Sequence, residues 1–201
     1  MRSNRLEAFS DGVLAIIITI MVLELRAPVA EGPATFSDLR DGETYLVFLS
    51  YVLSFVYIAI YWNNHHHLMQ SVDRVTGGIL WANMALLFCL SLFPFATSWL
   101  GENVGDPAPA AAYGVVLLAA GASYTLLVRV IIRSQGEDSL TARAMGRDSK
   151  GLVSVGVYAI AIPAAYFAVW ISYLLFVAVA ILWVVPDRRI ERVLAEEGRL
   201  D

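Results

Sequence analysis

Two groups of polar side chains in this sequence have the chemistry for moving protons or guiding ions. Ser10 and Asp11 lie about one helical turn inside an apolar run that begins near Arg5. Ionisable side chains at membrane depth are energetically unfavourable, and they normally face a bundle interior or a water-filled path. The run is therefore predicted to be an inner helix. Asp11 is also the type of residue that a proton-coupled transporter would use.

Three consecutive histidines, His65 to His67, form the second group. Imidazoles are common metal ligands, but neighbouring residues of a helix point about 100° apart, so these three cannot converge on one ion. No cysteine or carboxylate stands nearby at metal-ligand spacing, and we predict no metal site. We expect His65 or His66 to bond polar residues of the first helix and His67 to face water or headgroups. A histidine in such a network would make the activity of the protein depend on pH.

Several function classes receive no support from the sequence. It has no Walker loop, no Gly-x-Ser-x-Gly and no His-Glu-x-x-His, so we expect no enzyme and no cofactor. A net charge of -4 makes nucleic acid a poor partner. The single cysteine, Cys89, lies within an apolar run and is expected to be inert packing.

The composition is that of an all-α integral membrane protein. Hydrophobic residues make up 58% of the 201 residues and charged residues only 16%, and the mean hydropathy is +0.64. Soluble domains are nearer half apolar and a quarter charged. The excess apolar surface must face lipid, and we predict a single transmembrane domain over residues 1–201.

Six stretches have the length and hydropathy of membrane-spanning helices, for which about 20 apolar residues are needed. They lie at about 5–25, 44–67, 76–100, 109–133, 150–167 and 169–186. The segments 26–43, 101–109 and 134–150 carry turn-forming residues and are predicted loops. The segment 150–186 is too long for one span and short for two. Pro163 and the aromatic residues after it predict a hairpin of two short helices.

The distribution of lysine and arginine predicts the orientation. With six spans, the strongly basic segments all fall on one side, which is expected to be cytoplasmic. Both termini then lie in the cytoplasm, and residues 187–201 form a short charged cytoplasmic tail. A cleaved signal peptide is disfavoured, because Asp11 and Glu24 interrupt the apolar region that such a peptide needs.

The faces of the first helix follow from spacing. Ile16, Ile20 and Leu23 are spaced i, i+4, i+7 and share one stripe, with Gly12 and Thr19 beside it. Spacing alone fits an ordinary helix-packing surface as well as a pore lining. In the third span Asn83 requires a polar partner, and we expect Trp62 and Asn64 to belong to the same network.

The first helix also carries a sequence motif. Arg5, Phe9, Ser10, Asp11 and Gly12 follow the pattern Arg-x-x-x-Phe-Ser-Asp-Gly, continued by an apolar stretch with a threonine to Leu23. This motif resembles the signature of the transmembrane protein 175 family of potassium channels, in the bacterial branch that has one six-helix repeat per chain. Further similar elements are Tyr61-Trp62-Asn63-Asn64-His65-His66, then Trp81, Asn83 and 92–95, and the segment 186–189.

The resemblance implies a homotetramer in the plasma membrane whose first helices surround a central pore that passes potassium without a pore loop. It places the hydrophobic constriction at Ile16, with Ile20 and Leu23 along the path and a polar ring at Thr19. It also implies a structural and gating network that holds the pore helices. The residues predicted for this network are Arg5, Phe9, Ser10, Asp11, Trp62, Asn64, His65, His66 and Asn83.

Two other functions remain open on sequence. The first is a proton-coupled secondary transporter that uses Asp11 and the histidines of the second helix, although no internal repeat of the kind common in transporters is found. The second is a non-conducting membrane scaffold. Flux that saturates and follows a proton gradient would indicate the transporter, and the absence of any ion flux would indicate the scaffold.

Overall fold

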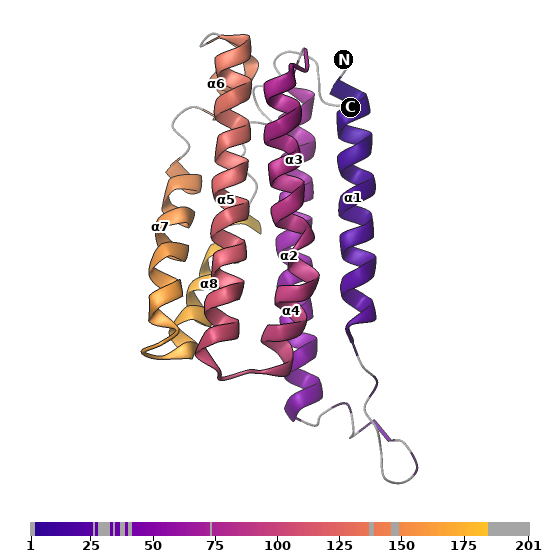
Figure 1. Ribbon diagram of the computed structural model, residues 1–201, viewed down its shortest axis with the longest axis vertical. Coiled ribbons are helices and arrows are strands. Elements are labelled where there is room, and N and C mark those ends of the chain that lie inside the picture. Colours follow the sequence, from indigo (N-terminus) through magenta and orange to yellow (C-terminus); the bar gives the residue numbers. More distant parts are fainter. Residues whose placement is uncertain are drawn as a thin grey trace.

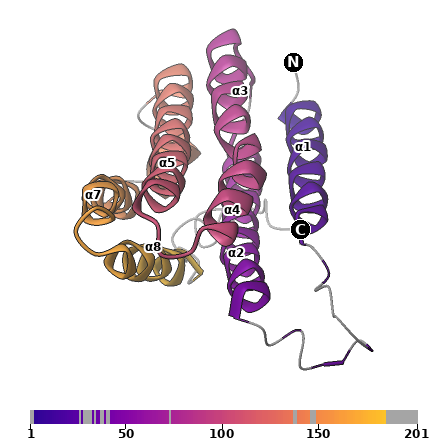
Figure 2. The ribbon, with the colours of Figure 1, turned by 60° about the horizontal axis from the view of Figure 1, so that its bottom comes forward.

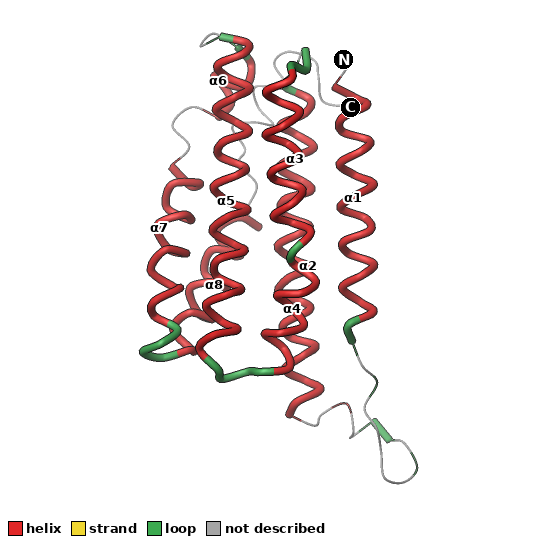
Figure 3. Tube along the Cα trace, viewed as in Figure 1, coloured by secondary structure: helices red, strands yellow, loops and turns green. Residues whose placement is uncertain are grey.

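The computed structural model describes residues 3–25, 27, 33, 35, 36, 39, 42–72, 74–136, 139–145 and 149–184. Within these ranges all regular secondary structure is helical and no strand occurs (Figure 3). The predicted all-α class is therefore confirmed. The predicted tail at 187–201 lies outside the described residues.

Among the described residues, four long helical stretches are apolar enough to cross a membrane by length and composition: Ser3–Leu23, Thr44–Gln70, Gly77–Glu102 and Pro107–Gln135. The first is α1 (Ser3–Leu23), the second lies in α2 (Gly42–Gln70) and the fourth is α5 (Pro107–Gln135). At about 1.5 Å per residue each reaches roughly the 30 Å of a bilayer core. The first four predicted runs are thus present as helices.

The third run consists of two helices, α3 (Gly77–Ser91) and α4 (Phe93–Glu102), and not of one continuous helix as expected. Pro94 causes the interruption, because it has no N–H to donate to the preceding turn. Leu92 between the helices keeps helical torsions, with φ −82° and ψ −11°, and its N–H bonds back to the carbonyls of Cys89 and Leu90. The two helices therefore pass through the bundle as one column (Figure 1).

The predicted loop 134–150 is partly wrong. It contains a short helix, α6 (Leu140–Met145), and α5 continues to Gln135. Thr141 in α6 is buried against Ser71 at the end of α2, with 2.7 Å between the two hydroxyl oxygens. Local composition gives no information about this tertiary contact, and the polar stretch is therefore predicted as a loop from its sequence.

The two short helices predicted after residue 150 are present as α7 (Ser149–Ala164) and α8 (Val169–Val184). The turn between them exposes Tyr166 and Phe167, and Trp170 is exposed at the start of α8. These aromatic side chains belong to the types that favour the membrane interface. With 16 residues each, α7 and α8 are shorter than the four long apolar stretches, which have 21 to 29 residues.

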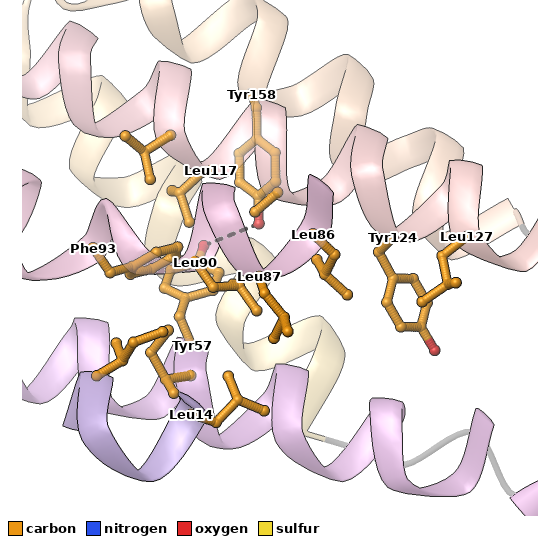
Figure 4. Close-up of a cluster of buried hydrophobic side chains, with 14 of the residues drawn as sticks. Leu14, Tyr57, Leu86, Leu87, Leu90, Phe93, Leu117, Tyr124, Leu127 and Tyr158 are labelled. Carbon is orange, nitrogen blue, oxygen red and sulfur yellow. Dashed lines mark hydrogen bonds between the residues drawn. The ribbon is translucent and has the colours of Figure 1, made fainter. Parts of the chain in front are cut away.

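The helices form a bundle with α1 at one edge and the α7–α8 hairpin at the other (Figures 1 and 2). α1 packs against α2, α3 and α4, whereas α5 packs against α3, α4, α7 and α8. The core between them contains Leu86, Leu90 and Leu117 together with aromatic rings (Figure 4). The aromatic hydroxyls are paired, because Tyr158 donates to the Tyr57 oxygen at 3.3 Å and Tyr57 donates to the carbonyl of Phe176 at 2.6 Å.

A close approach at Gly114 fixes how α5 meets the hairpin. A Cβ at this position would lie 3.0 Å from Ile162 Cγ1 and 3.2 Å from Phe176 Cζ. We expect Gly114→Val to destabilise the protein by about 1–3 kcal/mol through overpacking, seen as a lower thermal midpoint in detergent. The control is Gly156→Val in α7, where a Cβ would meet nothing within 4 Å. Equal midpoints for the two variants would contradict the assigned packing.

Candidate functional site

One face of α1 is buried against the bundle. It consists of Leu6, Ser10, Leu14, Ile17 and Met21, which recur at the three- and four-residue spacing of a single helix face. Apart from Ser10, the face is apolar. The face fixes the rotation of α1, and with it the residues that α1 presents outward.

A fully buried chain of hydrogen bonds holds α1 to α2 and α3. Asn83 Nδ2 donates to Ser10 Oγ at 3.0 Å, and His65 Nε2 lies 2.8 Å from Asn83 Oδ1. Ser10 in turn donates to the carbonyl of Leu6. The three polar side chains are 0–1% exposed. Polar groups at this depth have no water to bond, so they must bond one another. This row of hydrogen bonds therefore specifies how the three helices fit together.

A second, more exposed set of bonds joins α1 to α2 at the same end of the bundle. Trp62 Nε1 donates to Asp11 Oδ1 at 3.0 Å. One turn earlier on α1, the carboxylate of Glu7 lies 2.8 Å from His66 Nδ1, an ion pair whenever the imidazole is protonated. Gln70 Nε2 lies 3.1 Å from the other nitrogen of that ring. We call Ser10, Asp11, Trp62, His65 and Asn83 the anchor network.

The structure does not bring every predicted network residue together. Asn64 does not bond α1: its side-chain amide donates to the carbonyl of Ile60, and its backbone carbonyl accepts from the Tyr124 hydroxyl on α5. Phe9 is 51% exposed and Arg5 is exposed at the start of α1. His65 reaches Ser10 only through Asn83, and His67, expected to face water or headgroups, is partly exposed.

Sequence reasoning missed Glu7 and Gln70. A signal for Glu7 was available, since it precedes Asp11 by four residues and thus shares its helix face. Gln70 follows His66 by the same interval on α2. The sequence could not predict that the α1 face with Glu7 meets the α2 face with His66, because this pairing depends on how α1 and α2 are rotated about their axes.

The outward face of α1 is apolar and exposed in the single chain. Exposed fractions are 59% for Ile16, 42% for Ile20 and 78% for Leu23. Phe9, Ile16 and Leu23 follow one another at intervals of seven residues, the repeat at which helices associate along a seam. Thr19 is also exposed, and its hydroxyl donates to the Ile16 carbonyl, so the oxygen lone pairs stay available.

At the other end of α1, acidic side chains border an open cavity of about 560 Å³. Glu24, Glu102 and Asp106 are among its lining residues. In the part of the chain that the structure describes, no group of three or more histidine, cysteine or acidic residues is arranged to hold a metal ion. Carboxylates around an open cavity raise the local concentration of cations without fixing one in place.

The anchor network gives a direct test of how α1 is attached. We expect Trp62→Phe to lower the thermal midpoint in detergent, because it removes the donor to Asp11; a typical hydrogen bond contributes about 0.5–1.5 kcal/mol net. Trp81→Phe is the matched control, since Trp81 is 79% exposed and no hydrogen bond of its indole occurs among the described residues. A smaller loss for Trp62→Phe than for Trp81→Phe would contradict the bond.

An all-helical bundle with several helices apolar enough to cross a membrane is the architecture of a multi-pass membrane protein. Residues 5–94 match the family model described as "Endosomal/lysosomal potassium channel TMEM175". A potassium channel of Chryseobacterium sp. is 46% identical over 196 residues, which is 98% of this chain and 100% of the relative. The chain belongs to the TMEM175 family.

Other relatives place the chain within that family. A potassium channel of Chamaesiphon minutus is 31% identical over 85% of this chain and 87% of the relative. The crystal structure of a lysosomal potassium-selective channel TMEM175 homologue from Chamaesiphon minutus superposes with a TM-score of 0.75 at 27% identity, covering 92% of this chain and 97% of the other. The human endosomal/lysosomal proton channel TMEM175 is 24% identical over 90% of this chain and 37% of its own length.

Proposed function

We propose that this chain is a subunit of a homotetrameric potassium-selective channel in which α1 lines a central pore. The observation that carries the proposal is the outward face of α1. The anchor network fixes the opposite face in the bundle, and Ile16, Ile20 and Leu23 remain exposed on an edge helix. One chain cannot enclose a path with one helix, so several copies must meet along this face. The names of the bacterial relatives support potassium as the permeant ion.

In the proposed pore Ile16 forms the narrowest ring, and the hydroxyls of Thr19 form a polar ring one turn beyond it. An ion passing an apolar ring must shed part of its water, and potassium gives up water more readily than sodium. The acidic cavity at Glu24 and Glu102 would enrich cations at the outer mouth. Flow is passive, and no cofactor takes part.

The proposal includes six spans per chain, with α7 and α8 as the last two, and a plasma-membrane location with both termini in the cytoplasm. The basic residues at the end of the bundle where α5 ends and α7 begins, among them Arg129, Arg133 and Lys150, support this orientation.

Ion flux into liposomes tests the function. Purified protein is reconstituted, and potassium, sodium and proton uptake are followed separately under an imposed voltage. We expect potassium to enter faster than sodium, in proportion to its gradient. The vertebrate relatives are named proton channels, so proton uptake without potassium uptake would assign that function instead. Saturating uptake driven by a proton gradient would assign the transporter, and no uptake of any ion would overturn the channel.

The oligomer is tested independently by native mass spectrometry in detergent. Each chain has a mass of 22.1 kDa, and we expect four copies in the intact particle. A monomer or dimer that still conducts would overturn the shared central pore.

A further inference from the structure

A small cavity lies between α2, α5, α7 and α8. Its interior volume is about 30 Å³, and a buried water requires about 10–15 Å³ of such space. The cavity therefore has room for about one or two waters and for no organic ligand. Gly121 on α5 and Gly151 on α7 are among the lining residues, and neither has a side chain to fill the space. Among the residues considered for the pore and its anchor, only Asn64 borders this cavity.

The hydroxyl of Tyr61 lies at the wall of this cavity. A Cβ on Gly121 would lie 3.8 Å from Tyr61 Oη, and both residues line the cavity. Among the described residues the Tyr61 hydroxyl forms no hydrogen bond. A hydroxyl in an apolar interior is unfavourable without a hydrogen bond, and tyrosine hydroxyls inside proteins usually have a partner. The Tyr61 hydroxyl thus requires a partner that the surrounding side chains do not supply.

The neighbouring hydroxyls of the wall have already donated their hydrogens. Tyr158 donates to the Tyr57 hydroxyl at 3.3 Å (Figure 4). Thr125 donates to a backbone carbonyl one turn earlier in α5, at 3.0 Å. Ser154 donates to a backbone carbonyl one turn earlier in α7 and accepts from Trp183 Nε1 at 2.8 Å. A hydroxyl has one hydrogen and two lone pairs, so these oxygens can only accept further bonds.

A water molecule matches this set of groups. The wall offers one hydrogen, that of Tyr61, and several oxygen lone pairs. Water can accept the hydrogen and donate its own two hydrogens to the lone pairs. Buried waters in proteins make about three hydrogen bonds, usually to groups that have no other partner. An apolar occupant would leave the Tyr61 hydroxyl without a bond.

We propose that this cavity binds one or two structural waters, which accept a hydrogen bond from Tyr61 and donate to hydroxyl oxygens of α5 and α7. The water would then join α2 and α5 to the α7–α8 hairpin from inside the bundle. The proposal is independent of whether α1 lines a pore, and its readouts are water occupancy and stability.

X-ray radiolysis of the full chain in nanodiscs detects such a water. Radiolysis converts a bound water into a hydroxyl radical that oxidises the adjacent side chain, and mass spectrometry locates the oxidised residue. Tyr158 and Tyr113 are a matched pair: they are 2% and 0% exposed, both hydroxyls are hydrogen-bonded, and only Tyr158 lines the cavity. We expect Tyr158 to be oxidised and Tyr113 to be protected. Equal protection of the two would indicate a dry cavity and overturn the proposal.

Gly121→Ala tests whether the oxidation originates in this cavity. The added Cβ would lie 3.8 Å from Tyr61 Oη and Tyr158 Cε2, which is ordinary contact, so the walls can keep their positions. A methyl group occupies about the space of one water, and we expect Tyr158 to lose most of its oxidation. Gly156→Ala is the control, because a Cβ there would meet nothing within 4 Å. Wild-type oxidation of Tyr158 in Gly121→Ala would also overturn the proposal.

Tyr61→Phe gives an independent test, because a wet and a dry cavity predict opposite signs. In a dry cavity the hydroxyl is an unpaired polar group, and its removal should raise the thermal midpoint in detergent. With water bound, the substitution removes a hydrogen bond, and we expect the midpoint to fall by a few degrees. Tyr45→Phe is the control and should change little, since Tyr45 is 52% exposed near the start of the same helix. A raised or unchanged midpoint for Tyr61→Phe would contradict the bound water.

Discussion

Replacing Ile16 by asparagine is expected to raise potassium flux about tenfold and to remove most of the preference over sodium. The amide oxygen would replace part of the hydration shell that an apolar ring strips from the ion. A tenfold gain corresponds to about 1.4 kcal/mol off the barrier, the size of a typical net hydrogen bond. Sodium, which holds water more strongly, gains more than potassium. The measurement is potassium and sodium uptake into liposomes by wild type and Ile16→Asn.

Two controls make the result specific to the proposed pore. Ile160→Asn introduces the same amide at a residue of similar exposure, 64% against 59%, on the far edge of the bundle. It should leave flux unchanged. Ile16→Leu keeps an apolar ring of similar volume and should keep the preference for potassium. Flux changes that are equal in Ile16→Asn and Ile160→Asn would place the constriction elsewhere.

Asn83→Leu is expected to produce the largest loss of stability. The substitution removes both bonds of the buried hydrogen-bond chain. It leaves His65 Nε2 without its partner, while Ser10 keeps only its bond to the carbonyl of Leu6. Interhelical hydrogen bonds in membranes average about 0.6 kcal/mol and reach about 1.7, and each orphaned buried group costs about 1–3 kcal/mol. We expect a total loss of about 2–4 kcal/mol, measured as a fall in the thermal midpoint in detergent.

Asn64→Leu is the matched control for Asn83→Leu. The Asn64 amide donates only within its own helix, to the carbonyl of Ile60, so its replacement should have a smaller effect. A second measurement follows the attachment of α1 directly. A cysteine at Leu14, which is 1% exposed, should resist alkylation in a Cys89→Ser background and become reactive when Asn83→Leu is added. Unchanged protection would show that the apolar face alone holds α1.

The long apolar helices were predictable because membrane spanning imposes a length and a composition on each segment. The stripe of Ile16, Ile20 and Leu23 was predictable too, since its members share a face by spacing, and the structure leaves that face exposed. What spacing could not decide was whether the stripe contacts lipid or another copy of the chain. That choice depends on association between chains.

The polar contacts were only partly predictable. Asn83 had to find a partner in an apolar run, and the structure supplies Ser10 and His65. Asn64 was assigned to the same network, yet it adjoins His65 in the sequence and therefore points about 100° away on the helix, toward α5. The rotation of α2 about its axis decides whether Asn64 or His65 points toward α1. That rotation is set by the packing of α2 against all its neighbours.

The shortness of α7 and α8 also bears on the lipid that surrounds the protein. The 16 residues described for each helix reach about 24 Å, whereas the bilayer core is about 30 Å thick and the 29 residues of α5 reach about 43 Å. If these two helices cross the membrane with this length, as the proposed six spans require, lipid beside the hairpin would thin to meet it, while lipid beside α5 would not. Hydrophobic mismatch would then fall at one edge of the bundle, and the proposed channel would be sensitive to bilayer thickness.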